Sequence, residues 1–114
     1  MPAKPITVVE TKPFERLAAT VWTEAERAEF VDFIARNPEA GDVIPDTGGV
    51  RKVRWMRQGS GKRGGARVIY FYHRPEMPLY LLLIYAKAQR TDMTPDEKKA
   101  VRRLAGELKA QFGS

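Results

Sequence analysis

A run of seven residues at Leu79–Tyr85, LYLLLIY, is apolar at successive positions and not merely at alternate ones. Side chains along a β-strand point alternately to the two faces of its sheet, so a strand of this composition needs cover on both faces. The run therefore predicts a central strand that is packed on both sides. Even with Ala86 it has only eight residues, far fewer than a helix needs to cross a bilayer.

Two Thr-x-x-Glu patterns, Thr23 with Glu26 and Thr94 with Glu97, are capping boxes that mark the first turns of two helices. Pro38 ends the first of these helices, because the residue before a proline avoids the α region. The second helix has one apolar face at helical spacing, which predicts that it packs on the sheet. The side chains expected on that buried face are Val101, Leu104, Leu108 and Phe112.

These signals, together with β-branched and alternating segments, predict the whole order of elements. In chain order they are a strand at 6–9, helices at 13–19 and 23–37, strands at 50–56, 66–73 and 79–85, and a helix at 95–112. The order is β-α-α-β-β-β-α. It predicts a single α+β domain over residues 1–114, with a small antiparallel sheet packed against helices.

Composition limits the classes of protein to which the chain can belong. It has no cysteine and one histidine, which excludes a disulfide framework, a thiolate metal site and a multi-histidine metal site. With 43% hydrophobic and 30% charged residues, a globular fold is expected. The N-terminus, MPAKPITVVE, has no apolar segment of signal-peptide length. The expectation is a cytoplasmic protein that uses no metal or cofactor and contacts no membrane.

Positive charge is concentrated in one segment. Residues 47–75 carry eight basic residues and no acidic one, whereas residues 1–46 have a net charge of −4. The segment also contains Trp55, Tyr70, Phe71 and Tyr72, so cations and aromatic rings alternate on two predicted strands. This pattern predicts a surface for a polyanion with bases, most simply RNA. The basic residues are Arg51, Lys52, Arg54, Arg57, Lys62, Arg63, Arg67 and Arg74.

A solvated, merely solubilising face is the alternative interpretation of this charge. Solvated faces usually mix signs, and six of the eight cations here are arginines, whose planar fork matches phosphate oxygens. Strand alternation places Lys52 and Arg54 on one face, and Val53 and Trp55 on the other. The glycines at 59–65 lack the Gly-Lys-Ser/Thr ending and the following helix of a nucleotide-binding loop, so they predict a long hairpin that presents Lys62 and Arg63.

Two further side chains are candidates for an RNA site. His73 is the only imidazole and would suit a general base, although a half-exposed structural histidine at a strand end fits equally well. Tyr85 ends the apolar strand just before Ala86 and Lys87, and it is the best candidate for stacking on a base. The acidic residues cluster in the predicted helices, which does not favour two-carboxylate chemistry.

Three spaced motifs then resemble a known family. GGVRKVRW at 48–55, GKRGGARVIY at 61–70 and IYAK at 84–87 are similar to the RelE/HigB-type toxins of bacterial toxin–antitoxin systems, in particular the HigB-like branch. The resemblance covers nearly the whole chain, including NPEAG at 37–41 and DTGG at 46–49. It implies the RelE-like β-α-α-β-β-β-α fold, in agreement with the order predicted above.

The resemblance also implies a function: an mRNA interferase that cuts messenger RNA in the ribosomal decoding site and is silenced by a cognate antitoxin, here expected to be a helix-turn-helix, HigA-like protein. By position, Lys52 and Arg54 take the place of the family's Lys-x-Lys pair. Arg67 takes that of the arginine facing the scissile phosphate, and Lys87 lies in the basic segment after the last strand. The family's catalytic C-terminal tyrosine has no counterpart in residues 90–93. The residues expected to contact RNA are Arg51, Lys62, Arg63, His73 and Tyr85.

The chemistry that suits these side chains is attack of a ribose 2′-hydroxyl on the adjacent phosphorus, which requires alignment, proton transfer and cations. Arg54 and Arg67 would stabilise charge, and Lys52 or Lys87 would serve as the base. A ParE-like inhibitor of DNA gyrase would share the fold, and a plain RNA-binding module would protect RNA without cutting it.

Overall fold

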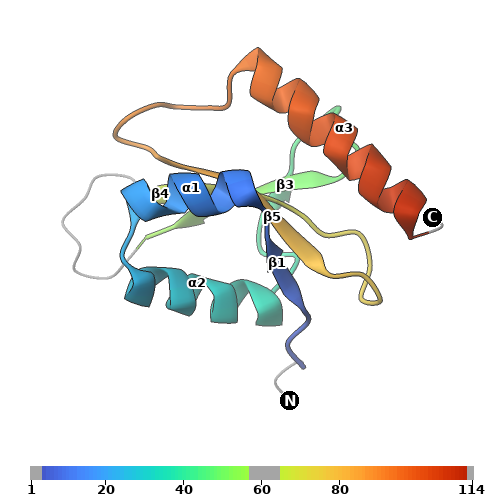
Figure 1. The fold of residues 1–114 in the computed structure, drawn as a ribbon, viewed down its shortest axis with the longest axis horizontal. Coiled ribbons are helices and arrows are strands. Elements are labelled where there is room, and N and C mark those ends of the chain that lie inside the picture. Colours follow the sequence, from blue (N-terminus) through green and yellow to red (C-terminus); the bar gives the residue numbers. More distant parts are fainter. Residues whose placement is uncertain (1–3, 57–64, 113–114) are drawn as a thin grey trace.

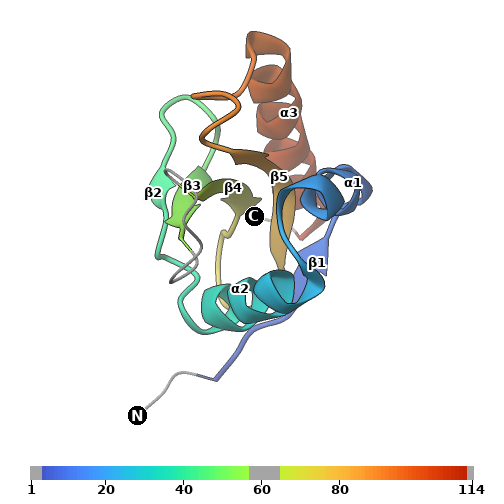
Figure 2. The same ribbon diagram turned by 90° about the vertical axis from the view of Figure 1, so that its left-hand side faces the viewer.

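The computed structural model, which describes residues 4–56 and 65–112, has a five-stranded sheet between two helical layers (Figures 1 and 2). The elements are β1 (Val8–Glu10), α1 (Lys12–Val21), α2 (Glu24–Arg36), β2 (Asp42–Val43), β3 (Val50–Trp55), β4 (Ala66–Phe71), β5 (Leu79–Ala86) and α3 (Pro95–Gln111). The strands lie in the order β1-β5-β4-β3-β2. One side of the sheet packs on α1 and α2, and is called the α1–α2 face; the other packs on α3, and is called the α3 face.

The predicted fold class and the order of the helices and main strands are confirmed, with additions. β1 pairs in parallel with β5, whereas the other three pairings are antiparallel, so the sheet is mixed. β5 is covered on both faces as expected, but β4 is the middle strand. β2 was not predicted, because it has two residues within a segment of turn-forming residues, which is too short to show a strand pattern.

The helices begin where their caps predict. Thr23 and Thr94 each accept a hydrogen bond from the backbone N–H of the glutamate three residues on, at 3.2 and 3.1 Å, and each glutamate accepts one in return. α1 has a cap that the sequence prediction missed. The Thr11 hydroxyl accepts from the backbone N–H of Phe14 and donates to the carbonyl of Leu81 at 2.9 Å, which ties the start of α1 to β5.

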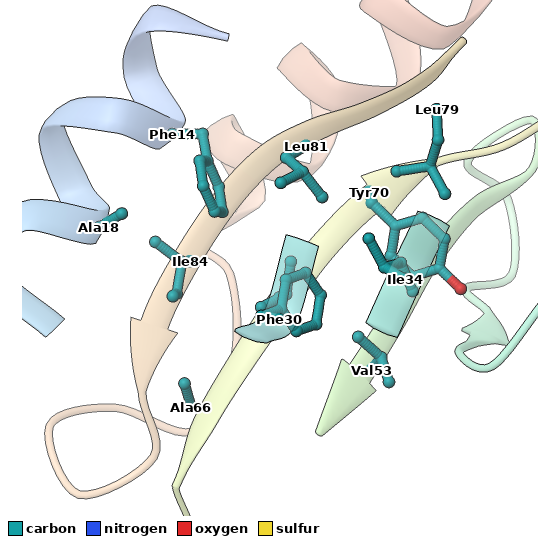
Figure 3. Packing of buried hydrophobic residues seen from close by; sticks show 11 residues of the cluster. Phe14, Ala18, Phe30, Ile34, Val53, Ala66, Tyr70, Leu79, Leu81 and Ile84 are labelled. Atoms are coloured by element: carbon teal, nitrogen blue, oxygen red, sulfur yellow. The ribbon is translucent and has the colours of Figure 1, made fainter. Parts of the chain in front are cut away.

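The α1–α2 face is closed by a core of large side chains (Figure 3). Phe14 from α1 and Phe30 from α2 are fully buried against the sheet, in the same cluster as Tyr70, the largest fully buried side chain. Aromatic rings continue this core to the end of β3. The ring centroid of Trp55 lies 5.3 Å from that of Phe30 and 5.0 Å from that of Phe33. Trp55 thus lies on the face opposite Lys52 and Arg54, as alternation predicts, and it packs in the core and is not part of the expected base-stacking surface.

The connection between α2 and β2 is held to the sheet by two side chains of the motif segments. The Tyr70 hydroxyl accepts from the N–H of Gly41 and donates to the carbonyl of Pro38, both at 2.8 Å. Arg51 donates to the carbonyls of Gly41 at 2.7 Å and of Glu39 at 3.4 Å. A Cβ atom on Gly41 would lie 2.8 Å from a β3 carbonyl oxygen and 2.9 Å from the Tyr70 ring, so this close approach requires glycine.

The α3 face is only partly covered by its helix. Val101, Ala105 and Leu108 are buried against the sheet, and Ala105 is fully buried because its short side chain lets the helix approach closely. Leu104 and Phe112, predicted to be buried, are only partly so. The buried stripe on α3 is therefore rotated towards Ala105, a residue that an apolar pattern of large side chains does not highlight.

Candidate functional site

Three residues of the α3 face form a row across three strands. In the sheet register Arg54 of β3 is the direct partner of Arg67 of β4, and Arg67 is the direct partner of Tyr85 of β5. Like charges placed opposite one another destabilise a strand pair. The register therefore places two like charges side by side, and a bound anion would relieve their repulsion.

Lys52 lies two residues before Arg54 and points to the same face, as alternation predicts. Its ammonium group is 3.7 Å from the carboxylate of Asp92, in the connection between β5 and α3. More than a third of the Lys52 side chain and almost two thirds of the Asp92 side chain are exposed, so this ion pair is weak. A phosphate that approaches the row can take the place of Asp92.

Tyr85, expected to stack on a base, is 3% exposed and does not present its ring at the surface. Its hydroxyl donates to the carbonyl of Thr91 at 3.3 Å, and the Arg90 guanidinium lies 4.8 Å from its ring centroid. Burial raises the pKa of Tyr85, and the charge of Asp92 adds to that rise, whereas Arg67 and Arg90 oppose it. Tyr85 is thus a neutral, buried member of the row and not an open platform.

The connection after β5 is anchored by a side chain that the sequence prediction did not single out. Arg90 donates to both carboxylate oxygens of Glu97, at 2.7 and 3.1 Å. This hydrogen bond is the main cause that lowers the pKa of Glu97 and raises that of Arg90. Glu97 also accepts from the backbone N–H of Thr94, so one carboxylate fixes both the start of α3 and the position of Arg90 over Tyr85.

Lys87 follows β5 at the same end of the sheet as the row. Its backbone N–H donates to the carbonyl of Gly65 at 3.0 Å, and the preceding Ala86 is the partner of Ala66, next to Arg67. Gly65 has a φ of +59°, and a Cβ atom there would collide with the carbonyl oxygen of Trp55. A glycine is therefore required where the strand that carries Arg67 begins.

Two expected RNA contacts lie elsewhere in the structure. Arg51 points to the α1–α2 face, where it donates to backbone carbonyls and lies 3.9 Å from the Glu39 carboxylate. His73 lies two residues beyond the end of β4, exposed, with its ring stacked on Phe71 at the opposite end of that strand from Arg67. Lys62 and Arg63 fall outside the described residues. The structure thus places Lys52, Arg54, Arg67 and Tyr85 on one face, with Lys87 after β5 at the end of the sheet near Arg67, and separates Arg51 and His73 from them.

No group of three or more His, Asp or Glu side chains that could hold a metal ion occurs among residues 4–56 and 65–112. Within the same residues, no helix is both long and apolar enough to cross a membrane.

Comparison with known proteins identifies the family and matches the fold. The family model of the RelE toxin of the RelE/RelB toxin–antitoxin system matches residues 6–113. The chain belongs to the RelE toxin family. Its fold is also that of a solved structure, the free state of an E. coli RelE toxin in which two arginines are replaced by alanine. That structure matches with a TM-score of 0.59 and 10% identity, over 89% of this chain and 99% of the E. coli chain. Membership of the RelE family implies a cognate antitoxin as partner.

Proposed function

We propose that this RelE-family toxin is a ribosome-dependent mRNA endoribonuclease of the HigB-like branch that inhibits translation. The observation that carries the proposal is the direct partnership of Arg54 and Arg67 on an open part of the α3 face. Like charges directly opposite one another disfavour a strand pair, and a bound anion relieves that repulsion. Lys52 beside it and Lys87 at the same end of the sheet extend the positive charge, and the scissile phosphate is the anion that this arrangement fits.

The reaction that suits these groups is a transesterification that needs no metal ion. The ribose 2′-oxygen forms a bond to the adjacent phosphorus and the bond from phosphorus to the 5′-oxygen breaks, which leaves a cyclic phosphate and a free 5′-hydroxyl. One proton leaves the 2′-hydroxyl and one reaches the 5′-oxygen. Arg54 and Arg67 stabilise the charge that develops on the phosphorus-bound oxygens. Lys52 and Lys87 are the side chains proposed for proton transfer.

The surroundings of the row fit this assignment. Tyr85 lies beside Arg67 in the register, and Arg90, fixed by Glu97, holds its ring in place. Catalysis by positioned charges requires that they do not reorganise during the reaction. Arg51 and His73 have no role in the proposed reaction because of where they lie, whereas Lys62 and Arg63 remain proposed RNA contacts.

The proposed antitoxin is a helix-turn-helix, HigA-like protein. The same cations that bind RNA attract an acidic partner segment, so we expect part of the antitoxin to cover the α3 face or to keep it from the ribosome. Unchanged antitoxin affinity after substitution of Arg54 and Arg67 would place neutralisation at a remote surface.

Primer extension on cellular mRNA after a brief pulse of expression tests the proposed activity. Discrete cuts in phase with codons are expected for the wild-type toxin, and none for Arg67→Ala at equal expression. Removal of one donor to a transition-state charge costs roughly a hundredfold or more in rate. Intact mRNA together with gyrase-linked DNA breaks would instead assign the toxin to the ParE-like class, and full toxicity of Arg67→Ala would contradict the assigned site.

A further inference from the structure

A second group of cations lies outside the row, on the exposed side of α3. It consists of Lys98, Lys99, Arg102 and Arg103, called here the α3 ridge, and no acidic residue interrupts it. All four are exposed, and none forms an ion pair within residues 4–56 and 65–112. Arg27, Arg36 and Arg90, by contrast, each pair with a carboxylate.

This arrangement is unfavourable for an isolated helix. Lys98 and Arg102, like Lys99 and Arg103, are four residues apart, so each pair places like charges on neighbouring turns. Asp96 and Glu107 lie one turn before and one turn after the ridge, but within the ridge itself the charge is all positive, which is the clustering that a polyanion-binding surface requires.

The ridge borders a cavity of about 260 Å³ between α3 and the connection from β2 to β3. Pro95, Lys98, Lys99 and Arg102 line it from the helix, and Asp46 lines it from the connection. The hollow therefore has a cationic rim that includes one carboxylate. That carboxylate can accept a hydrogen bond from a ribose 2′-hydroxyl, a donor that RNA carries and that DNA and a polyglutamate chain lack.

The α3 ridge and the row belong to the same side of the molecule, because α3 packs on the face that carries Arg54 and Arg67 (Figure 1). Glu97, one residue before the ridge, pairs with Arg90, which lies over the Tyr85 ring, so one chain of contacts joins the two surfaces. We infer that the α3 ridge and its cavity form a second RNA-docking surface, which binds the sugar–phosphate backbone of ribosomal RNA and not the strand that is cut. This inference rests on the proposed function, because that function brings the toxin to the ribosome.

The test compares two charge-matched variants for binding to purified ribosomes that carry no mRNA, over a range of salt concentrations. One is Lys98→Gln with Arg102→Gln, on the ridge. The control is Lys12→Gln with Arg16→Gln, an exposed lysine and arginine at the same four-residue spacing on α1, where Glu15 lies between them. Glutamine keeps helix propensity in both.

Each lost phosphate contact lowers the steepness of log K against log salt by about 0.7 for single-stranded RNA, so the ridge variant is expected to lose about 1.4 and the control nothing. The cleavage rate of the ridge variant at saturating ribosome concentration should stay within about twofold of wild type, because no ridge residue belongs to the row. An unchanged salt slope would overturn the inference. So would weaker binding to a polyglutamate peptide with ribosome affinity intact, which would indicate an acidic-protein surface.

The proposed cleavage activity and the proposed docking surface can be refuted independently of each other. Arg67→Ala should keep most ribosome affinity and lose cleavage, which is the opposite pattern to that of the ridge variant. A wild-type toxin that binds ribosomes in a ridge-dependent manner but leaves their mRNA intact would retain the docking surface and refute the cleavage activity. A wild-type toxin that does not bind ribosomes at all would refute the docking surface.

Discussion

The two faces of the sheet use the same strands in opposite ways. On the α1–α2 face, β3 and β4 contribute Val53, Trp55, Val68 and Tyr70 to a closed core. Arg51, the cation that these two strands place on that face, donates hydrogen bonds to backbone carbonyls. On the α3 face, the same strands contribute Lys52, Arg54 and Arg67 to a surface that the helix leaves partly open. Whether a cation in the basic segment holds the fold together or faces the candidate site therefore depends on which face of the sheet its position in the strand points to.

The closed face should respond to substitution through stability. Phe30→Ala is expected to lower the free energy of unfolding by about 3–5 kcal/mol, because the ring is fully buried and contacts Trp22, Phe33 and Trp55. Urea denaturation followed by tryptophan fluorescence measures the change. A loss below about 1 kcal/mol would mean that this face collapses around the cavity and is less rigidly packed than the comparison requires.

A smaller loss of stability is expected from the hydroxyl that holds the connection between α2 and β2. Tyr70→Phe leaves the N–H of Gly41 and the carbonyl of Pro38 without their partner, which costs about 1–3 kcal/mol. The cleavage rate at low temperature should not change, because Tyr70 lies on the face opposite the row. Reduced cleavage by a fully folded Tyr70→Phe protein would show that the two faces are coupled, and would contradict the division between a structural and a functional face.

The smallest effect concerns the anchor of the open face and depends on pH. The pKa of Glu97 is lowered in the folded protein, mainly by the hydrogen bond from Arg90. Its contribution to stability is therefore present above the unfolded pKa of about 4.3 and is lost as pH falls through the lower folded pKa. Glu97→Gln should reduce Tm at pH 7 by more than at pH 3. Glu29→Gln, an exposed glutamate on α2, is the control and should show no such difference.

Short-range signals in the sequence were enough for much of this account. The capping boxes at Thr23 and Thr94 place two helices, and alternation assigns Lys52 and Arg54 to one face because a strand has a fixed period of two. The register that makes Arg54 the partner of Arg67 does not follow from the sequence. A long glycine-rich hairpin leaves register open, and residues 57–64 lie between the two strands.

Contacts between residues far apart in the sequence explain why two predicted RNA contacts, Arg51 and Tyr85, lie elsewhere or are buried in the structure. Arg51 looks like its neighbours in the basic segment, but the carbonyls that it binds belong to a loop ten residues earlier, which the sequence alone does not place beside β3. Tyr85 looks like an exposed ring at a strand end until the following connection folds back with Arg90 over it. The role of Arg90 itself depends on Glu97, whose capping signal gave no indication of a second partner.

The two faces of the sheet divide structure from function, and two arginines on β3 test that division. Arg51 and Arg54 are three residues apart on β3 and point to opposite faces. Each is replaced by glutamine, and thermal melting and single-turnover cleavage of ribosome-bound mRNA are measured for both. Arg51→Gln is predicted to lower Tm and keep the wild-type rate below its melting temperature, whereas Arg54→Gln, which removes one of two like charges in register, should keep or raise Tm and lose roughly a hundredfold in rate. Loss of cleavage by a fully folded Arg51→Gln protein, or an unchanged rate for Arg54→Gln, would contradict the account.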